Sequence, residues 1–382
     1  MMKIVYCTPS IYIAGGVERV LALKANYFAE RFGYDITIIL TDGAGKQPYY
    51  PLSDKVKVIN LDIGFEELWT CSFIKKVFVY LRKQRLFKRK LRTELMRLCP
   101  DITVSMLRRE INFITDIKDG SRKIGELHVN KANYRNFNES DSNMFKRLFA
   151  RFWMASLVSK LKRLDRFVVL TDEDLKEWHG LDNVASIPDP LSFTPSGRSN
   201  LTRKRVIAVG RYCHEKGFDL LLKAWSKVEK ECTDWELAIF GMGEREPYER
   251  LTDELGIDRS RCRLNGSTRD IEREYTDSAL FVLSSRFEGF GMVLVEAMAC
   301  GLPAVAFDGA CGPRSIISHG EDGLLVPAEN TDKLADAMVQ LMKSPERIKQ
   351  MADKAVVKSQ QYDIDIIAGK WRALFEDVYN KK

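Results

Sequence analysis

The sequence predicts an α/β protein of two domains, in each of which strands and helices alternate along the chain. The first observation is length, because 382 residues exceed what one hydrophobic core usually organises. The second is that short apolar runs alternate with amphipathic helical segments in both halves of the chain. The third is a break at residues 188–202, which are rich in Pro, Gly, Ser and Thr and suit a linker. We therefore expect one domain over residues 1–190 and a second over residues 200–362.

The first domain opens with a strand, a helix and a strand, which is the order of a βαβ unit. Lys3–Cys7 and Asp35–Leu40 are the strands, and Val17–Glu30 is the helix between them. Similar apolar runs predict that strands continue as far as the linker. These runs are Lys57–Leu61, Ile102–Ser105, Lys123–Glu126, Arg166–Leu170 and Ala185–Ile187.

The second domain repeats this pattern after the linker, and a final helix follows it. Apolar side chains between Ile366 and Val378 recur at helical spacing, so one face of the helix over residues 363–382 must be buried. We expect this C-terminal helix to cross back and pack on the first domain. The strands predicted for the second domain are Arg205–Val209, Glu236–Phe240, Arg261–Leu264, Leu280–Leu283 and Ala304–Phe307.

The composition is that of a folded protein without a membrane span, with 45% hydrophobic residues. No early apolar run reaches the roughly 18 residues of a membrane-spanning helix, and residues 1–6 have the pattern of a strand, not of a signal peptide. We therefore expect the protein to stay in the cytoplasm. The eight cysteines form no C-x-x-C pair and no metal-ligand spacing, which is typical of buried thiols in a reducing compartment.

Positive charge is concentrated in the first half, where residues 1–190 hold 32 Lys and Arg against 23 Asp and Glu, a balance of +9. This asymmetry favours a polyanionic partner, either nucleic acid or an anionic membrane surface. Zinc-finger and aromatic RNP motifs are absent from the sequence, so we expect no nucleic-acid partner. Residues 75–98 predict a basic amphipathic helix that suits an anionic membrane, and the basic, aromatic run 146–153 suits the same surface. A solvated outer helix is the alternative.

The segment from Ser284 to Glu296 carries the clearest chemical signal. It follows a predicted strand and enters a helix through a loop in which Gly289 and Gly291 allow a ligand to approach the backbone closely. The unpaired N–H groups and positive dipole at the helix start suit a diphosphate. Glu288 can reach sugar hydroxyls from the loop, and Glu296, about one turn into the helix, can accept hydrogen bonds from a ribose. A plain strand-to-helix turn is the alternative.

Glu288 and Glu296 match the E-x7-E signature of glycosyltransferase family 4, and the resemblance continues through residues 297–303, 312–317 and 320–326. The resemblance implies a GT-B fold, in which two Rossmann-like domains face each other across a cleft. It also implies retaining transfer of a sugar from a nucleotide-sugar donor without a metal ion or other cofactor. The donor contacts that it implies in this segment are Glu288, Gly289, Phe290, Gly291, Met292, Val293 and Glu296.

Residues 209–221 resemble the G-R-x4-K-G segment that opens the donor domain of the same family. Arg211 and Lys216 follow a predicted strand, where open α/β sheets bind ligands. The resemblance implies that these cations hold the donor diphosphate and stabilise the leaving group in place of a metal. A solvated basic turn is the alternative. Gly241 resembles part of the next strand-to-glycine turn, and Asn265 and Gly266 resemble the loop that binds the nucleobase.

The first domain carries two further matches. Gly15 and Gly16 resemble the N-terminal glycine loop of the family, which contacts the donor, although paired glycines are common in any Rossmann-like turn. Residues 126–130 resemble the strand-end E-H-x-N whose histidine faces the reacting sugar, so His128 is a catalytic candidate together with Arg211, Lys216 and Glu288. A satisfied core histidine is the alternative. Leu127 separates Glu126 from His128, unlike the contiguous family form, and no role is assigned to Glu126.

The sequence predicts no metal-binding site. The D-x-D at residues 172–174 is better explained as a helix start, with Thr171 as N-cap and Asp174 completing a capping box. Because no carboxylate is expected below the anomeric carbon, we favour front-face attack, in which the donor β-phosphate helps to deprotonate the acceptor hydroxyl.

The donor and acceptor are predicted only by class. Residues 312–314 resemble family members that build bacterial surface polysaccharides, so we expect a UDP-hexose or UDP-N-acetylhexosamine, with GDP-mannose as the second choice. A lipid-linked saccharide acceptor would suit the basic helix at 75–98 and a peripheral position on the inner face of the membrane. A GT-B sugar-nucleotide epimerase or a hydrolase that cleaves the donor is the alternative enzyme.

Overall fold

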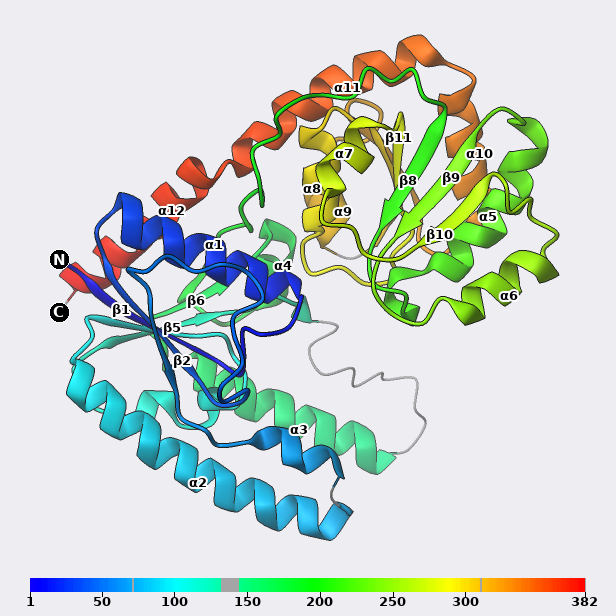
Figure 1. The fold of residues 1–382 in the computed structure, drawn as a ribbon. Coiled ribbons are helices and arrows are strands. Elements are labelled where there is room, and N and C mark those ends of the chain that lie inside the picture. Colours follow the sequence, from blue (N-terminus) through cyan, green and yellow to red (C-terminus); the bar gives the residue numbers. More distant parts are fainter. Residues whose placement is uncertain (71, 132–143, 310, 382) are drawn as a thin grey trace. The chain divides into compact units, whose positions relative to one another are not determined.

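The computed structural model describes residues 1–70, 72–131, 144–309 and 311–381, and the chain divides into two compact units. Unit 1 comprises Met1–Pro188 and Ile364–Lys382, whereas unit 2 comprises Asp189–Asp363. The chain therefore passes into unit 2 after Pro188 and returns to unit 1 with its last helix (Figure 1).

Unit 1 contains a parallel sheet in the strand order β3-β2-β1-β4-β5-β6-β7. The central strand β1 pairs on both sides, so that Ile4 lies opposite Ile36 of β2 and Ile102 of β4. Continuous apolar runs suit these strands because both faces of a parallel sheet are covered. The strands are β1 (Lys3–Thr8), β2 (Asp35–Leu40), β3 (Lys57–Asn60), β4 (Ile102–Ser105), β5 (Arg122–Glu126), β6 (Arg166–Val169) and β7 (Val184–Ser186).

Helices cover both faces of this sheet (Figure 1). Helices α1 and α12 enclose one core, where Phe28 and Phe375 meet edge to face with ring centroids 5.7 Å apart. Helices α2 and α3 close a second core around Phe87 and Leu161. Within the described part of the chain, no helix combines the length and the apolar character needed to cross a membrane. The helices of unit 1 are α1 (Gly16–Arg31), α2 (Phe73–Leu98), α3 (Met144–Leu161), α4 (Asp172–Glu177) and α12 (Ile364–Asn380).

Unit 2 contains a parallel sheet in the order β10-β9-β8-β11-β12-β13. Its core includes Trp225 and Phe307, both almost fully buried. The strands are β8 (Arg205–Val209), β9 (Glu236–Phe240), β10 (Cys262–Asn265), β11 (Leu280–Leu283), β12 (Ala304–Asp308) and β13 (Gly323–Pro327), and the helices are α5 (Phe218–Glu231), α6 (Glu246–Glu254), α7 (Ile271–Thr276), α8 (Met292–Ala299), α9 (Gly312–Ile316), α10 (Thr331–Met342) and α11 (Pro345–Ser359).

Strand β13 is absent from the sequence prediction. It begins at Gly323 and ends at Pro327, and glycine and proline weaken the pattern of a strand. The structure tolerates both because β13 lies at the edge of the sheet, where Pro327 is opposite Asp308 at the end of the ladder. An edge position cannot be recognised from such a short segment.

The predicted capping box at α4 is only half formed. The Thr171 hydroxyl accepts a hydrogen bond from the Asp174 amide at 3.1 Å, as an N-cap should. The Asp174 carboxylate does not return this bond, because it accepts one from the backbone amide of Lys131 at 2.9 Å. Thr171 is therefore the N-cap, and Asp174 instead ties α4 to the segment after β5.

The cysteines only partly fit the expectation of buried thiols. Every cysteine in the described residues is free, but Cys99 is exposed and Cys213 is half-buried. Cys71 lies outside the described residues. Burial raises the pKa of the Cys262 and Cys300 thiols to about 12, so these two are inert at neutral pH.

Each sheet has one place where the strand order reverses. In unit 1 this switch point lies between β1 and β4, and in unit 2 it lies between β8 and β11. Loops that leave two such strands run to opposite faces of the sheet, and ligands of open α/β sheets bind beyond the carboxyl ends of these strands. The two switch points therefore locate the candidate sites.

Candidate active site

The loops that follow β8 and β11 meet closely at the switch point of unit 2. Gly217, at the end of the first loop, has φ 61°, in the left-handed region that favours glycine. A Cβ atom there would lie 2.1 Å from the backbone oxygen of Ser284, which opens the second loop. Glycine at this position therefore lets the two loops touch, and it brings the predicted residues Lys216 and Glu288 within reach of each other.

Lys216 and Glu288 form an ion pair across these loops. Lys216 Nζ lies 2.5 Å from Glu288 Oε1, and the side chains are 19% and 10% exposed. The Ser285 hydroxyl donates to the same carboxylate oxygen at 2.8 Å, while the Ser284 hydroxyl donates to the backbone oxygen of Lys216 at 3.0 Å. The lysine is thus held in place but remains partly accessible, so its ammonium can also bind an incoming phosphate.

Arg286 ties the loop after β11 to the loop after β8 and to the start of α5. Its guanidinium makes paired hydrogen bonds to the Asp219 carboxylate at 2.8 and 2.7 Å, and it donates to the backbone oxygen of His214 at 2.8 Å. Burial raises the pKa of Asp219, but the hydrogen bonds and charge of Arg286 outweigh this effect and lower it. Asp219 therefore stays ionised and the fork-to-fork contact persists at neutral pH.

Glu296 is more deeply buried than its predicted role requires. Only 2% of the residue is exposed, in α8. The Ser192 hydroxyl donates to Oε1 at 2.5 Å and the Tyr275 hydroxyl donates to Oε2 at 3.2 Å. Glu296 thus links α8 to α7 and to the segment that opens unit 2. A role of Glu296 toward a ribose stays a prediction.

The other predicted donor contacts surround this pair. Arg211 is exposed in the loop after β8, and Asn265 ends β10 with its backbone oxygen accepting from the Tyr212 hydroxyl at 2.9 Å. A Cβ atom on Gly241 would lie 1.7 Å from the backbone oxygen of Gly210, so glycine here allows the loops after β8 and β9 to touch. Gly266 follows Asn265, and the remaining contacts lie in the turn or the first residues of α8: Gly289, Phe290, Gly291, Met292 and Val293.

Unit 1 places Gly15 and Gly16 at the N-terminus of α1, next to the switch point. Gly15 is the N-cap and makes no side-chain capping bond. The first N–H groups of any α-helix lack intrahelical partners, and here the Glu18 carboxylate lies beside Gly15, where a Cβ atom would be 2.0 Å from Glu18 Oε2. This position after β1 corresponds to the position of Arg211 and Lys216 after β8 in unit 2.

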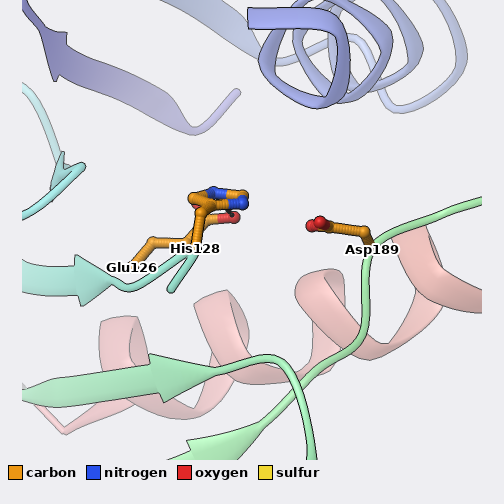
Figure 2. Close-up of side chains that lie close together, drawn as sticks. All are labelled: Glu126, His128 and Asp189. Atoms are coloured by element: carbon orange, nitrogen blue, oxygen red, sulfur yellow. Dashed lines mark ion pairs between the residues drawn. The ribbon is translucent and has the colours of Figure 1, made fainter. Parts of the chain in front are cut away.

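His128 lies just beyond the end of β5 and beside Glu126. The His128 Nε2 atom is 3.0 Å from Glu126 Oε1, and the histidine side chain is 5% exposed (Figure 2). Successive residues of an extended segment point to opposite faces, whereas residues two apart point to the same face. Glu126 and His128 can therefore meet in space although Leu127 lies between them in the sequence. The third side chain drawn in Figure 2, Asp189, is the first residue of unit 2 and follows Pro188 in the chain.

Lys24 of α1 completes a buried charge cluster in unit 1. Its ammonium pairs with Glu126, and both side chains are 1% exposed. It also lies 4.3 Å from the centroid of the Trp371 ring in α12. Burial raises the pKa of Glu126, but the charges of Lys24 and His128 outweigh it and lower the pKa to about 2. Glu126 is therefore a carboxylate at neutral pH and holds His128 in place.

Comparison with known proteins gives the class of protein that this chain resembles. Residues 193–357 match the family described as Glycosyl transferases group 1. The chain is also 28% identical over 379 residues to an uncharacterized glycosyltransferase of Haemophilus influenzae, covering 98% of this chain and 100% of the relative. The chain is thus similar to the group 1 glycosyltransferases over residues 193–357. The amylovoran biosynthesis glycosyltransferase AmsD of Erwinia amylovora is 26% identical, with 97% of this chain and 99% of AmsD covered.

The fold of this glycosyltransferase recurs in solved structures. The pneumococcal O-GlcNAc transferase GtfA in complex with UDP and GlcNAc superposes with a TM-score of 0.76 at 16% identity, covering 99% of each chain. The GT-B fold expected from the sequence is thereby confirmed.

Several residues that build the site of the glycosyltransferase are missing from the sequence prediction. Arg286 lies inside the predicted motif, and its place two residues before Glu288 was the one local signal for a role. Lys24 stands out as a lysine among the buried residues of α1, next to Ala25. Asp219 lies inside the segment 209–221 but the prediction gives it no role, and Ser192 and Tyr275 carry no local signal.

The surroundings of His128 do not favour the binding of a metal ion in this glycosyltransferase. Glu126 and His128 are potential ligands, but the ammonium of Lys24 already lies on Oε1 of the carboxylate, the oxygen nearest His128. A cation added to Glu126 would have to displace Lys24 from a buried pair or lie beside its positive charge, and either change is costly.

Proposed function

We propose that this glycosyltransferase moves a hexose or N-acetylhexosamine from a UDP-sugar to a saccharide acceptor with retention of configuration and without a metal ion. The observation that carries the proposal is the Lys216–Glu288 ion pair at the switch point of unit 2. The pair places a cation that can bind the diphosphate next to a carboxylate that can bind sugar hydroxyls. The relative GtfA, whose structure contains UDP and GlcNAc, supports the choice of nucleotide.

Unit 2 holds the donor in this proposal. Lys216 and the exposed Arg211 bind the diphosphate and offset the negative charge that develops as the sugar–phosphate bond breaks. Glu288 accepts hydrogen bonds from the sugar, and Glu296 accepts one from the ribose. Gly241, Asn265 and Gly266 lie in the loops after β9 and β10, where their backbone groups contact the nucleoside.

The chemical step is front-face attack in which the acceptor hydroxyl replaces the diphosphate on the same side of the sugar. Glu288 is assigned to the sugar hydroxyls and not to nucleophilic attack, and Lys216 and Ser285 hold its Oε1 atom in place. A donor phosphate oxygen accepts the proton from the acceptor hydroxyl as the new bond forms. His128, held by Glu126 in unit 1, contributes a hydrogen bond to the transferred sugar.

The acceptor side of the reaction belongs to unit 1 and to a membrane surface in this proposal. Large apolar side chains project from α2 and α3, with Phe78 72% and Phe152 74% exposed. Lys75, Lys76 and Arg82 on α2 are exposed around the first of them. An apolar surface ringed by cations is typical of proteins that lie on anionic lipid, which suits a lipid-linked saccharide acceptor in polysaccharide synthesis. The amylovoran relative AmsD supports this context.

The test is a panel of nucleotide sugars incubated with membrane extract and EDTA. We expect one UDP-sugar to release UDP and to label a lipid fraction, and the labelled product to keep the anomeric configuration of the donor. A strict metal requirement or an inverted product would contradict the proposal. Release of UDP without transfer, or interconversion of donor sugars, would favour the alternative of a hydrolase or an epimerase.

A further inference from the structure

The switch point of unit 1 carries an arginine that the proposed reaction does not use. In unit 2 the loop after β8 supplies the cations Arg211 and Lys216 at the switch point. In unit 1 the two loops at the corresponding place follow β1 and β4. The loop after β4 contains Arg108 and Arg109, so both switch points of the chain present arginine side chains.

The turn that presents Arg108 is held by buried polar contacts. Leu107 has φ 51°, a left-handed conformation that a leucine adopts only when its surroundings impose it. Glu110, 2% exposed, accepts a hydrogen bond from the Ser105 hydroxyl at 2.8 Å and one from the Arg108 amide at 3.0 Å. The backbone of Arg108 is therefore held in place, and its side chain is exposed.

Arg108 and its neighbour have different surroundings. The Arg109 guanidinium lies 3.9 Å from the buried Asp42 carboxylate and 4.3 Å from the centroid of the Phe65 ring. Its charge is thus compensated inside unit 1. Arg108 is exposed, its guanidinium makes no ion pair or hydrogen bond among the described residues, and its charge acts on the buried Glu110 carboxylate. Arg108 is therefore the arginine available to a ligand at this switch point.

An aromatic ring and a second exposed cation lie in the neighbouring loops. Tyr12 follows β1, and Lys46, in the loop after β2, lies 4.0 Å from the centroid of its ring. Lys46 is 51% exposed, and its nearest carboxylate, on Glu66, is 4.0 Å away. A ring with an adjacent cation can pack against a sugar while the cation binds an anionic substituent.

We propose that unit 1 binds a phosphate ester of the acceptor at the β1/β4 switch point, with Arg108 as its principal contact. The inference rests on the proposed function and deepens it, because it assigns the acceptor to the class of phosphate-bearing saccharides or polyols. The planar guanidinium donates two parallel hydrogen bonds to phosphate, a geometry that a neutral hydroxyl cannot match. The phosphate belongs either to a glycan or polyol chain or to a lipid diphosphate.

The test measures binding of small probes by NMR titration of the full chain with saturating UDP, which occupies the phosphate site of unit 2. The probes are glycerol 3-phosphate, uncharged glycerol and a short-chain prenyl diphosphate. We expect both phosphate probes to bind and glycerol not to bind. In Arg108→Gln the phosphate probes should bind about tenfold more weakly. The phosphate probe that binds more tightly identifies the source of the phosphate group.

The matched control is Arg89→Gln, which removes an exposed arginine from α2 in the same unit. Equal binding of glycerol 3-phosphate by the wild type, Arg89→Gln and Arg108→Gln would overturn the inference, as would absence of phosphate binding in the wild type. The same samples separate this failure from failure of the proposed function. If UDP binds normally but the probes do not depend on Arg108, only the inference fails; if UDP itself does not bind, the proposed donor site fails.

Discussion

Lys216 and Glu288 lie 72 residues apart in the sequence, yet their side chains form an ion pair with Nζ 2.5 Å from Oε1. The pair joins the two loops of the unit 2 switch point, and both residues belong to motifs recognisable from the sequence. The side chains are only 19% and 10% exposed, and we propose that the pair serves to bind the donor.

The first prediction concerns this pair. Lys216→Met and Glu288→Gln should each lower glycosyl transfer about 100-fold or more, because each removes a group that stabilises the departing diphosphate or positions the sugar. The double variant should be little worse than either single variant, since the two groups act as a unit. The measurement is kcat/KM together with the thermal unfolding temperature. Lys223→Met, which removes an exposed lysine of α5, is the control and should retain full activity.

A second prediction concerns the clamp between Arg286 and Asp219. Arg286→Lys should weaken UDP binding about tenfold, because an ammonium cannot reproduce the two parallel hydrogen bonds that hold the loops. A double-mutant cycle of Arg286→Lys and Asp219→Asn, read out by urea unfolding, should give a coupling energy of about 1–2 kcal/mol. Additive effects would mean that the clamp does not operate in solution.

The third prediction separates the structural and ligand-binding roles of Glu296. Ser192→Ala removes one donor to the buried carboxylate and should lower the free energy of unfolding by about 1 kcal/mol without changing UDP affinity. Glu296→Gln should weaken UDP binding about tenfold, because a ribose hydroxyl loses a charged acceptor. Calorimetric titration with UDP checks both variants. Equal UDP affinities for Glu296→Gln and Ser192→Ala would show that Glu296 is structural only.

A fourth prediction follows from the lowered pKa of Glu126. Its pKa is about 2 in the folded chain against an ordinary value of 4.5, so the stability it contributes is complete above pH 4.5 and is lost as the pH falls toward 2. Removal of Lys24 in Lys24→Met leaves a buried carboxylate without its main partner. This variant should lose about 3–5 kcal/mol at pH 7, and burial should then raise the pKa of Glu126.

The slope of stability against pH distinguishes this explanation from a packing defect. Since a raised pKa favours the protonated folded form, Lys24→Met should become more stable on acidification from pH 7 toward 5, opposite to the expected effect of a lowered pKa. The double variant Lys24→Met/Glu126→Gln should recover most of the loss at pH 7, because no buried charge remains. If the double variant is as unstable as Lys24→Met, the defect is one of packing and not of charge.

The fifth prediction concerns the exposed apolar side chains of α2 and α3. Phe78→Ser and Phe152→Ser should each reduce binding to vesicles that contain anionic phosphatidylglycerol by about tenfold, because each removes a large apolar group from the interface. Co-sedimentation measures the bound fraction. Met96→Ser is the control, since Met96 is 50% exposed near the opposite end of α2. An equal loss of vesicle binding in all three variants would show that Phe78 and Phe152 do not form a specific membrane-binding surface.

The strands and the main motifs could be predicted because their signals are local. A buried parallel strand such as Asp35–Leu40 is an unbroken apolar run, and a glycine loop before a helix is visible in a few residues. Glu288 and Lys216 were identifiable in the same way, from short segments that resemble a known family. Strand β13 shows the limit, because its terminal glycine and proline are acceptable only at the edge of a sheet.

The sequence by itself determined the α/β class, the alternation of strands and helices, and the residues at the switch point of unit 2. Only the tertiary structure decided which distant groups share a buried charge. Lys24 and Glu126 are separated by 102 residues and Ser192 and Glu296 by 104, and no periodicity links either pair. The physical reason is that a buried charge needs a partner close in space, whereas the chain supplies that partner from any element that the packing of the sheet and its helices brings near.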